Sequence, residues 1–164
     1  MRTGIPKGRL ISQLNGVFFQ GRKLFNEERT HFLLKPNDIP HLVSSGALDI
    51  GYATEEVLVE SEFAGEKTLI NVLPNRLCLL GRPDKSLFKG CTIATQYPKS
   101  TKATLGNDVN VLTVSGAAEA YIELGLADFI VDVVSSGATA KENGLVILEE
   151  LFVCSLYRLY RSAK

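Results

Sequence analysis

Tryptophan is absent from the 164 residues, and the only histidines are His31 and His41. These two residues are too isolated to predict a metal centre or a catalytic triad, and we expect both at the surface. The cysteines are three in number and widely spaced, at positions 78, 91 and 154. That pattern favours reduced thiols in buried strands over disulfides or a zinc site.

The chain also lacks a long hydrophobic run. Its longest stretch without a charged residue, 10–21, contains several polar residues, whereas a membrane helix needs about 20 apolar ones. The N-terminal MRTGIPKGRL has no apolar signal-peptide core, so we expect a cytoplasmic protein with no membrane partner.

No charge of one sign predominates, because 18 basic and 18 acidic residues cancel. The chain therefore has no overall field that would attract nucleic acid. Locally, residues 1–30 and 76–102 are basic. Two basic segments are typical either of the walls of a site for an anionic small molecule or of ordinary solvated surface.

Apolar segments alternate with helix-like segments along the chain. We expect strands over 30–35, 48–53, 68–73, 76–81, 91–95, 109–114 and 129–134. We expect helices over 10–18, 38–46 and 115–125 and another from Thr54, with Asp38 and Thr54 as N-caps and Gly46 and Gly125 as C-caps. This alternation predicts an α/β fold with a mostly parallel sheet and helices on its faces.

The polar segment 81–90 interrupts this pattern, and the tail 145–160 is strand-like without a helical partner. We therefore predict two lobes, with residues 1–77 plus 146–164 in lobe I and 78–145 in lobe II. A ligand is expected in the cleft between them, at the carboxyl ends of strands.

The segment FIVDVVSSGATAKENGL, residues 129–145, has the pattern of a buried strand that turns through small residues into a short helix. Such a turn leaves backbone N–H groups pointing outward, which suits a phosphate. Many ordinary α/β turns have the same pattern, so the turn alone leaves both interpretations open.

Several segments occur in one order along nearly the whole chain. They are IPKGRL (5–10), RKL (22–24), DIPHLVSSGALDIGYA (38–53), EVLVE (56–60), TIATQYP (92–98), SGAAEA (115–120), GLADFIVDVVSSGATAKENGL (125–145) and CSLYRLYRSAK (154–164). Together they resemble ATP phosphoribosyltransferase, and the tail is similar to the end of its short form.

The resemblance implies a two-lobe α/β fold of the type II periplasmic-binding-protein kind. It implies the first step of histidine biosynthesis, in which the phosphoribosyl group of phosphoribosyl pyrophosphate (PRPP) passes to N1 of ATP and pyrophosphate leaves. The expected cofactor is Mg²⁺ bound with PRPP or pyrophosphate. The family forms homo-oligomers, and its short form normally works with a separate regulatory subunit.

The family chemistry assigns expected roles to this chain's residues. Adenine N1 attacks without first losing a proton, so catalysis rests mostly on positioning and electrostatics. The 5′-phosphate is expected on the loop residues Ser135, Ser136, Gly137, Ala138, Thr139 and Ala140. Asp132 would face the ribose hydroxyls or their magnesium, and Lys7 and Arg9 would neutralise pyrophosphate or triphosphate.

The resemblance also places Gly116 and Glu119 at the substrate, and Asp49 and Gly51 at the nucleotide. Each charged residue has a plainer interpretation from the sequence alone. Asp132 and Asp49 suit capping carboxylates, Glu119 an exposed helical side chain, and Lys7 with Arg9 a basic turn.

The chain departs from the family pattern at several of these positions. SSGATA (135–140) replaces an acidic residue followed by Thr-Gly-Thr-Thr-Leu, GAAE (116–119) replaces Gly-Ser-Val-Glu, and Gln96 and Thr54 replace a usual lysine and glycine. Three lost contacts of about 1 kcal/mol each would cost over 100-fold. One alternative is therefore a non-catalytic or weakened module of the same fold that binds nucleotide or PRPP or acts in regulation. A second alternative is a solute-binding protein of the same fold class.

Overall fold

The computed structural model describes residues 1–8 and 24–161 and divides the chain into two compact units. Unit 1 is Met1–Val72 with Ser155–Lys164, and unit 2 is Leu73–Cys154. Both boundaries fall inside long strands, β4 (Lys67–Gly81) and β8 (Val146–Tyr160). The sequence predicted these boundaries at 77/78 and 145/146, and both differ from the boundaries in the structure.

The strand β4 corrects the expectation of separate strands over 68–73 and 76–81. Pro74 and Asn75 resemble a turn in the sequence, yet the strand continues through both. Pro74 is exposed, which fits the tendency of proline to occupy strand positions whose missing N–H is not needed for pairing.

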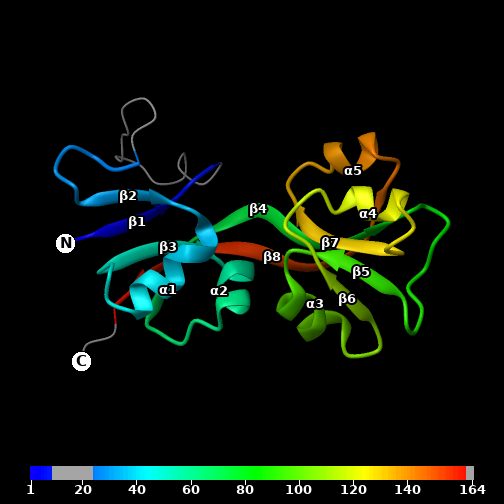
Figure 1. Cartoon of the computed structure of the whole chain (residues 1–164), viewed down its shortest axis with the longest axis horizontal. Coiled ribbons are helices and arrows are strands. Elements are labelled where there is room, and N and C mark those ends of the chain that lie inside the picture. Colours follow the sequence, from blue (N-terminus) through cyan, green and yellow to red (C-terminus); the bar gives the residue numbers. More distant parts are fainter. Residues whose placement is uncertain (9–23, 162–164) are drawn as a thin grey trace. The chain divides into compact units, whose positions relative to one another are not determined.

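Among the described residues, the unit 1 sheet has the order β2-β1-β3-β8-β4 and includes the first part of β4, residues 67–72 (Figure 1). The strands β1 (Thr3–Pro6), β2 (His31–Leu34) and β3 (Ile50–Thr54) are parallel, and the end of β8 is antiparallel to β3. The strand-like tail was therefore predicted correctly. The helix expected over 10–18 lies outside the described residues.

Two helices lie on one face of the unit 1 sheet, α1 (Ile39–Ser44) and α2 (Glu55–Ser61), and the short 3₁₀ helix η2 (Pro36–Asp38) precedes α1 (Figure 1). Buried residues of α1 and α2 form one cluster with Ala53 and Leu159 of the sheet. The predicted helix starts were close, and Asp38 and Thr54 occupy the N-cap positions of α1 and α2 as predicted. Neither residue makes a side-chain capping hydrogen bond.

Unit 2 has the strand order β8-β4-β7-β5-β6. β5 (Thr92–Thr95), β6 (Asn110–Thr113) and β7 (Phe129–Val134) are parallel, and β4 is antiparallel to β7. The helices are α3 (Pro98–Leu105), α4 (Glu119–Glu123) and α5 (Ala138–Glu142).

Helix α3 was not assigned a range from the sequence, and α4 begins four residues later than the expected 115. The late start of α4 has a backbone cause. Gly116 and Ala117 have φ of 151° and 50°, which are incompatible with a right-handed helix.

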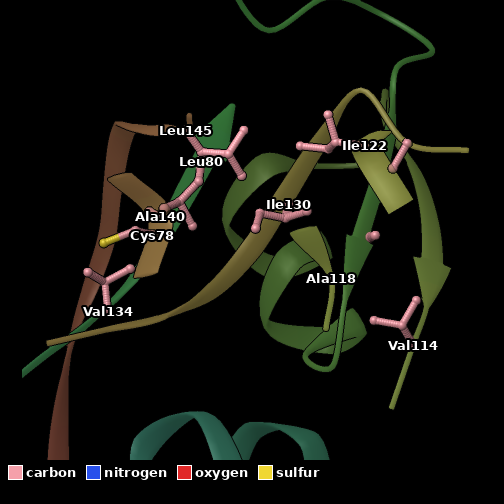
Figure 2. Close-up of a cluster of buried hydrophobic side chains, with 11 residues drawn as sticks. Cys78, Leu80, Val114, Ala118, Ile122, Ile130, Val134, Ala140 and Leu145 are labelled. Carbon is pink, nitrogen blue, oxygen red and sulfur yellow. The ribbon is translucent and has the colours of Figure 1, made fainter. Parts of the chain in front are cut away.

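The unit 2 sheet buries both of its faces. Ile130 and Val134 of β7 pack with Cys78, Leu80 and Ala140 on the face that α4 and α5 cover (Figure 2). On the other face, β7 contributes Phe129 and Val131 to a second cluster, against which Leu105 of α3 packs; its remaining members are Leu77, Leu79, Cys91, Ile93 and Val109.

The three cysteines are buried and none of them forms a disulfide, as predicted. His41 is exposed, whereas His31 is partly buried and its ring lies 3.0 Å from the Thr30 hydroxyl. Among the described residues, no helix is long and apolar enough to cross a membrane.

Candidate functional site

The three parallel strands of unit 2 end at one edge of its sheet. Thr95 of β5 is level with Thr113 of β6 and with Val131 of β7. Neighbouring strands lie about 4.8 Å apart, so these three level residues fall within roughly 10 Å of one another, and β7 continues beyond them to Val134. The chain continues from this edge into the loops that contain Gly116 and Ser135. This is the edge at which α/β sheets bind ligands.

Thr95 joins these strand ends. Its buried hydroxyl donates to the Val131 carbonyl at 2.7 Å and accepts the Tyr97 N–H at 2.9 Å. Its carbonyl accepts the Val114 N–H at 3.0 Å. The sequence interpretation did not single out Thr95, although its place at the end of an expected strand was a usable signal.

The loop after β7 presents small residues to solvent. Ser135, Ser136, Ala138 and Thr139 are exposed, while Ala140 is buried in the core. Gly137 has a left-handed backbone, with φ 76° and ψ 5°, immediately before α5. The Ala138 N–H lies 3.4 Å from the Ser136 hydroxyl, to which it donates. The predicted turn from strand into short helix is confirmed.

Gly137 has room for a side chain. A Cβ atom placed there would have Val134 Cγ1 and Ile147 Cδ1 as its nearest neighbours, at 3.9 and 4.0 Å. The left-handed backbone, and not packing, therefore favours glycine at this position. Asn and Asp tolerate such a backbone better than other non-glycine residues do.

Asp132 lies opposite Cys78 in the β4–β7 pair and is partly buried. Its Oδ1 accepts the Val133 N–H at 2.7 Å. Side chains alternate along a strand, so Asp132 lies on the same face as Ile130 and Val134, which is the face that α5 covers. The carboxylate is thus two residues before the loop entrance and on the side of the sheet toward which the loop turns.

The loop after β6 holds the other two expected residues of unit 2. Gly116 precedes Ala117, a non-glycine residue with a left-handed φ of 50°. Glu119 is the first residue of α4 and is partly buried. Strand β5 lies between β6 and β7, so the Gly116 loop and the Ser135 loop flank its end.

In unit 1, Lys7 follows the carboxyl end of β1. It is exposed, and its backbone N–H donates to the Leu34 carbonyl at 2.8 Å. Arg9 lies outside the described residues. At the carboxyl end of the neighbouring strand β3, the buried Thr54 hydroxyl donates to Glu56 Oε1 at 2.6 Å.

Asp49 lies at the opposite, amino end of β3. Its Oδ2 accepts the Arg2 N–H at 2.7 Å, and its Oδ1 is 3.6 Å from Arg161 Nη1. The pKa of Asp49 is lowered, chiefly by that backbone hydrogen bond. Desolvation is the next largest effect and raises the pKa, and the positive charges of the N-terminus, Arg161 and Arg2 lower it further. Through these contacts Asp49 joins the N-terminus and the end of β8 to β3.

Gly51 is buried beneath α1. A Cβ atom at this position would lie 2.4 Å from Ile39 Cγ2 and 2.8 Å from Val43 Cγ2. The absence of a side chain at Gly51 therefore allows α1 to lie close to β3. The structure does not bring Asp49 and Gly51 to the carboxyl edge at which Lys7 and Thr54 lie.

Comparison with solved structures first defines the class of fold. The alkanesulfonate-binding protein SsuA from Xanthomonas axonopodis pv. citri has a TM-score of 0.61 at 18% identity, covering 98% of this chain and 65% of that one. The aliphatic sulphonate binding protein SsuA from Escherichia coli has the same TM-score at 16% identity. The chain thus has the two-lobe α/β fold of type II periplasmic binding proteins.

Closer similarity defines the family. The model of the HisG family, ATP phosphoribosyltransferase, matches residues 35–163. The ATP phosphoribosyltransferase of Bacillus cytotoxicus is 32% identical over 99% of this chain and 88% of its own length. That of Hydrogenobaculum sp. is 31% identical over 93% and 85%. A structure of the HisG:HisZ complex from Thermotoga maritima has a TM-score of 0.79 at 29% identity, covering 98% of this chain and 86% of that one.

The chain belongs to the ATP phosphoribosyltransferase family. It is a glycosyltransferase of histidine biosynthesis that transfers the phosphoribosyl group of PRPP to N1 of ATP and releases pyrophosphate.

Proposed function

We propose that Ser135–Thr139 bind the 5′-phosphate of PRPP during this transfer. The observation that carries the proposal is the exposed, left-handed turn at Gly137, which follows a parallel strand at the ligand-binding edge of the sheet. Backbone N–H groups and the hydroxyls of Ser135, Ser136 and Thr139 would hold the phosphate oxygens. The alanines at 138 and 140 leave the backbone donors in place, and Ala140 anchors the loop to the core.

Asp132 is proposed to bind the ribose hydroxyls or the magnesium that accompanies PRPP. Among the described residues there is no group of three or more His, Cys, Asp or Glu side chains able to hold a metal by themselves. The Asp132 carboxylate, together with the phosphates of PRPP, fits Mg²⁺, because proteins usually hold this ion through one or two carboxylates and substrate phosphates. The bound ion would neutralise charge on the departing pyrophosphate.

The remaining proposed roles follow from the charge that develops in the reaction. As the bond from ribose C1 to pyrophosphate breaks, the sugar becomes positive and the leaving group negative. Lys7 and Arg9 would neutralise pyrophosphate or triphosphate, and Glu119 with Gly116 would position the substrate at the neighbouring strand end. Asp49 and Gly51 would support the nucleotide site indirectly, by holding β3 to its neighbours.

We also propose a homo-oligomer that works with a separate regulatory subunit in the cytoplasm. The similarity to a structure of a HisG:HisZ complex supports the homo-oligomer and the regulatory subunit. The use of ATP and PRPP supports the cytoplasm as the location.

The test of the proposed chemistry is pyrophosphate release in the presence of ATP, PRPP and Mg²⁺, with and without a regulatory subunit. Asp132→Asn should lower turnover by about 10- to 100-fold, the usual value of a charged hydrogen bond. Asp108→Asn is the matched control, because Asp108 is exposed near the amino end of β6 and pairs only with Lys89 among the described interactions. PRPP binding without turnover would support a binding module in place of an enzyme.

A further inference from the structure

Arg76 lies next to the entrance of the Ser135 loop. In the β4–β7 pair it is opposite Val134, the last residue of β7, and Cys78 is opposite Asp132. Cys78 and Val134 lie in one core cluster, so the side chain of Arg76, two residues from Cys78, lies on the same face of the sheet (Figure 2). Diagonal neighbours on such a face are about 7–8 Å apart, within reach of a long side chain. Arg76 is thus a direct neighbour of Val134 and a diagonal neighbour of Asp132.

Glu150 of β8 engages the guanidinium of Arg76. Its Oε1 accepts a hydrogen bond from Arg76 Nη1 and forms an ion pair with it. The side chain of Glu150 is 51% exposed and that of Arg76 31%, so the carboxylate can be replaced at little cost. The Nε atom of Arg76 is buried and has no hydrogen-bond partner among the described residues.

The Ser135 loop itself supplies no positive charge. Residues 135–140 contain only serine, glycine, alanine and threonine, and the next cation along the chain, Lys141, is exposed on α5. A phosphate held there by N–H and hydroxyl groups would keep most of its negative charge. Arg76 of β4 lies opposite Val134, the last residue of β7 before this loop, and guanidinium groups bind phosphate through two parallel hydrogen bonds.

We propose that Arg76 is a further phosphate-binding residue of the Ser135 loop, and that Glu150 holds its guanidinium until the phosphate of the ligand takes the place of the carboxylate. This inference rests on the proposed function of the loop. It makes the two members of one ion pair act in opposite directions on ligand binding.

The test is isothermal titration of PRPP with Mg²⁺ into the wild-type chain and into Arg76→Gln and Glu150→Gln. Arg76→Gln should weaken binding by about tenfold or more, the value of a charged hydrogen bond. Glu150→Gln should tighten binding by about threefold or more, because it frees the guanidinium and removes a competing charge. Arg76→Lys, which keeps the charge but not the paired hydrogen bonds, should lose part of the affinity.

Arg82→Gln is the matched control. Arg82 also forms an ion pair with a glutamate, Glu123, at 2.8 Å, but it follows the end of β4 that pairs with the start of β7, away from the Ser135 loop. Its replacement should leave the affinity unchanged. If the Arg76–Glu150 pair is purely structural, Arg76→Gln and Glu150→Gln should change the affinity for PRPP in the same direction, or leave it unchanged. Either result overturns the inference.

Failure of the inference and failure of the proposed function give different results. If wild type binds PRPP and Gly137→Asp abolishes binding, the loop binds phosphate whatever the Arg76 variants do. If wild type binds and Gly137→Asp does not weaken it, the loop is not the phosphate site and the role of Arg76 falls with it. Thermal unfolding of each variant identifies any loss of affinity that comes from loss of folding.

Discussion

Replacement of Gly51 by alanine tests the packing of unit 1 directly. Gly51 lies in β3 under α1, and its new methyl group would meet Ile39 Cγ2 at 2.4 Å and Val43 Cγ2 at 2.8 Å. Both distances are far below van der Waals contact. The helix must therefore move away from the sheet, or both side chains must change conformation.

The size of the effect follows from how little these neighbours can relax. Ile39 and Val43 are fully buried, and β-branched side chains in a helix have one strongly preferred rotamer. Overpacking of such a core costs about 1–3 kcal/mol, against a gain of about 0.4–1 kcal/mol from the lower entropy of the unfolded alanine chain. We expect Gly51→Ala to lower the free energy of unfolding by about 1–2 kcal/mol.

Urea unfolding followed by circular dichroism measures this change, and a double-mutant cycle identifies its cause. Ile39→Ala removes the methyl group that clashes, so Gly51→Ala should cost at least about 1 kcal/mol less in that background. Ile39→Val is the control, because valine also has two γ carbons and should not relieve the clash. A free energy of unfolding for Gly51→Ala within about 0.5 kcal/mol of wild type would refute the packing role of Gly51. Strict additivity of the Gly51→Ala and Ile39→Ala effects would refute it as well.

Two further predictions concern the loop after β6 and the salt links of Asp49. Ala117→Gly should raise the free energy of unfolding by about 0.5–1 kcal/mol, because it relieves a left-handed alanine at φ 50°. A lower free energy of unfolding in urea, the usual result of an Ala→Gly replacement, would contradict this. The carboxyl of Asp49 has a lowered pKa in the folded chain, so its stabilising effect is present above the ordinary value of 3.8 and is lost as pH falls through the lower folded-state pKa. The stability difference between wild type and Asp49→Asn should therefore narrow below about pH 3.8, and a difference that stays constant down to pH 2 would contradict the assignment.

The strands of unit 2 and the turn after β7 could be predicted because their signals are local. An apolar run such as residues 129–134, followed by small residues, indicates a buried strand that ends in a turn. Helix α3 was missed because PKSTKATL contains few apolar residues, and its start depends on Pro98 in the first turn. β4 was divided in two because Pro74-Asn75 is typical of a turn when its neighbours are unknown.

The roles of individual site residues depend on pairings between distant parts of the chain. Asp49 and Thr54 bracket the same strand, and only the pairing of β3 with β1 and β8 shows that Asp49 lies at its amino end beside Arg2 and Arg161. Arg76 is unremarkable in the sequence, and only its register with Val134 places it at the Ser135 loop. Local patterns carry no information on such register.

The most direct test of the central claim, that the Ser135 loop binds the 5′-phosphate, is a calorimetric titration of PRPP with Mg²⁺ into wild type, Gly137→Asp and Gly137→Asn. Aspartate and asparagine have the same shape, both tolerate the left-handed backbone, and the nearest atoms to a Cβ atom at 137 lie 3.9 Å away. They therefore differ only in the negative charge placed at the loop. We expect wild type to bind PRPP, Gly137→Asn to keep measurable binding and Gly137→Asp to lose it. Equal binding by the two variants, or no binding by wild type, would contradict the central claim.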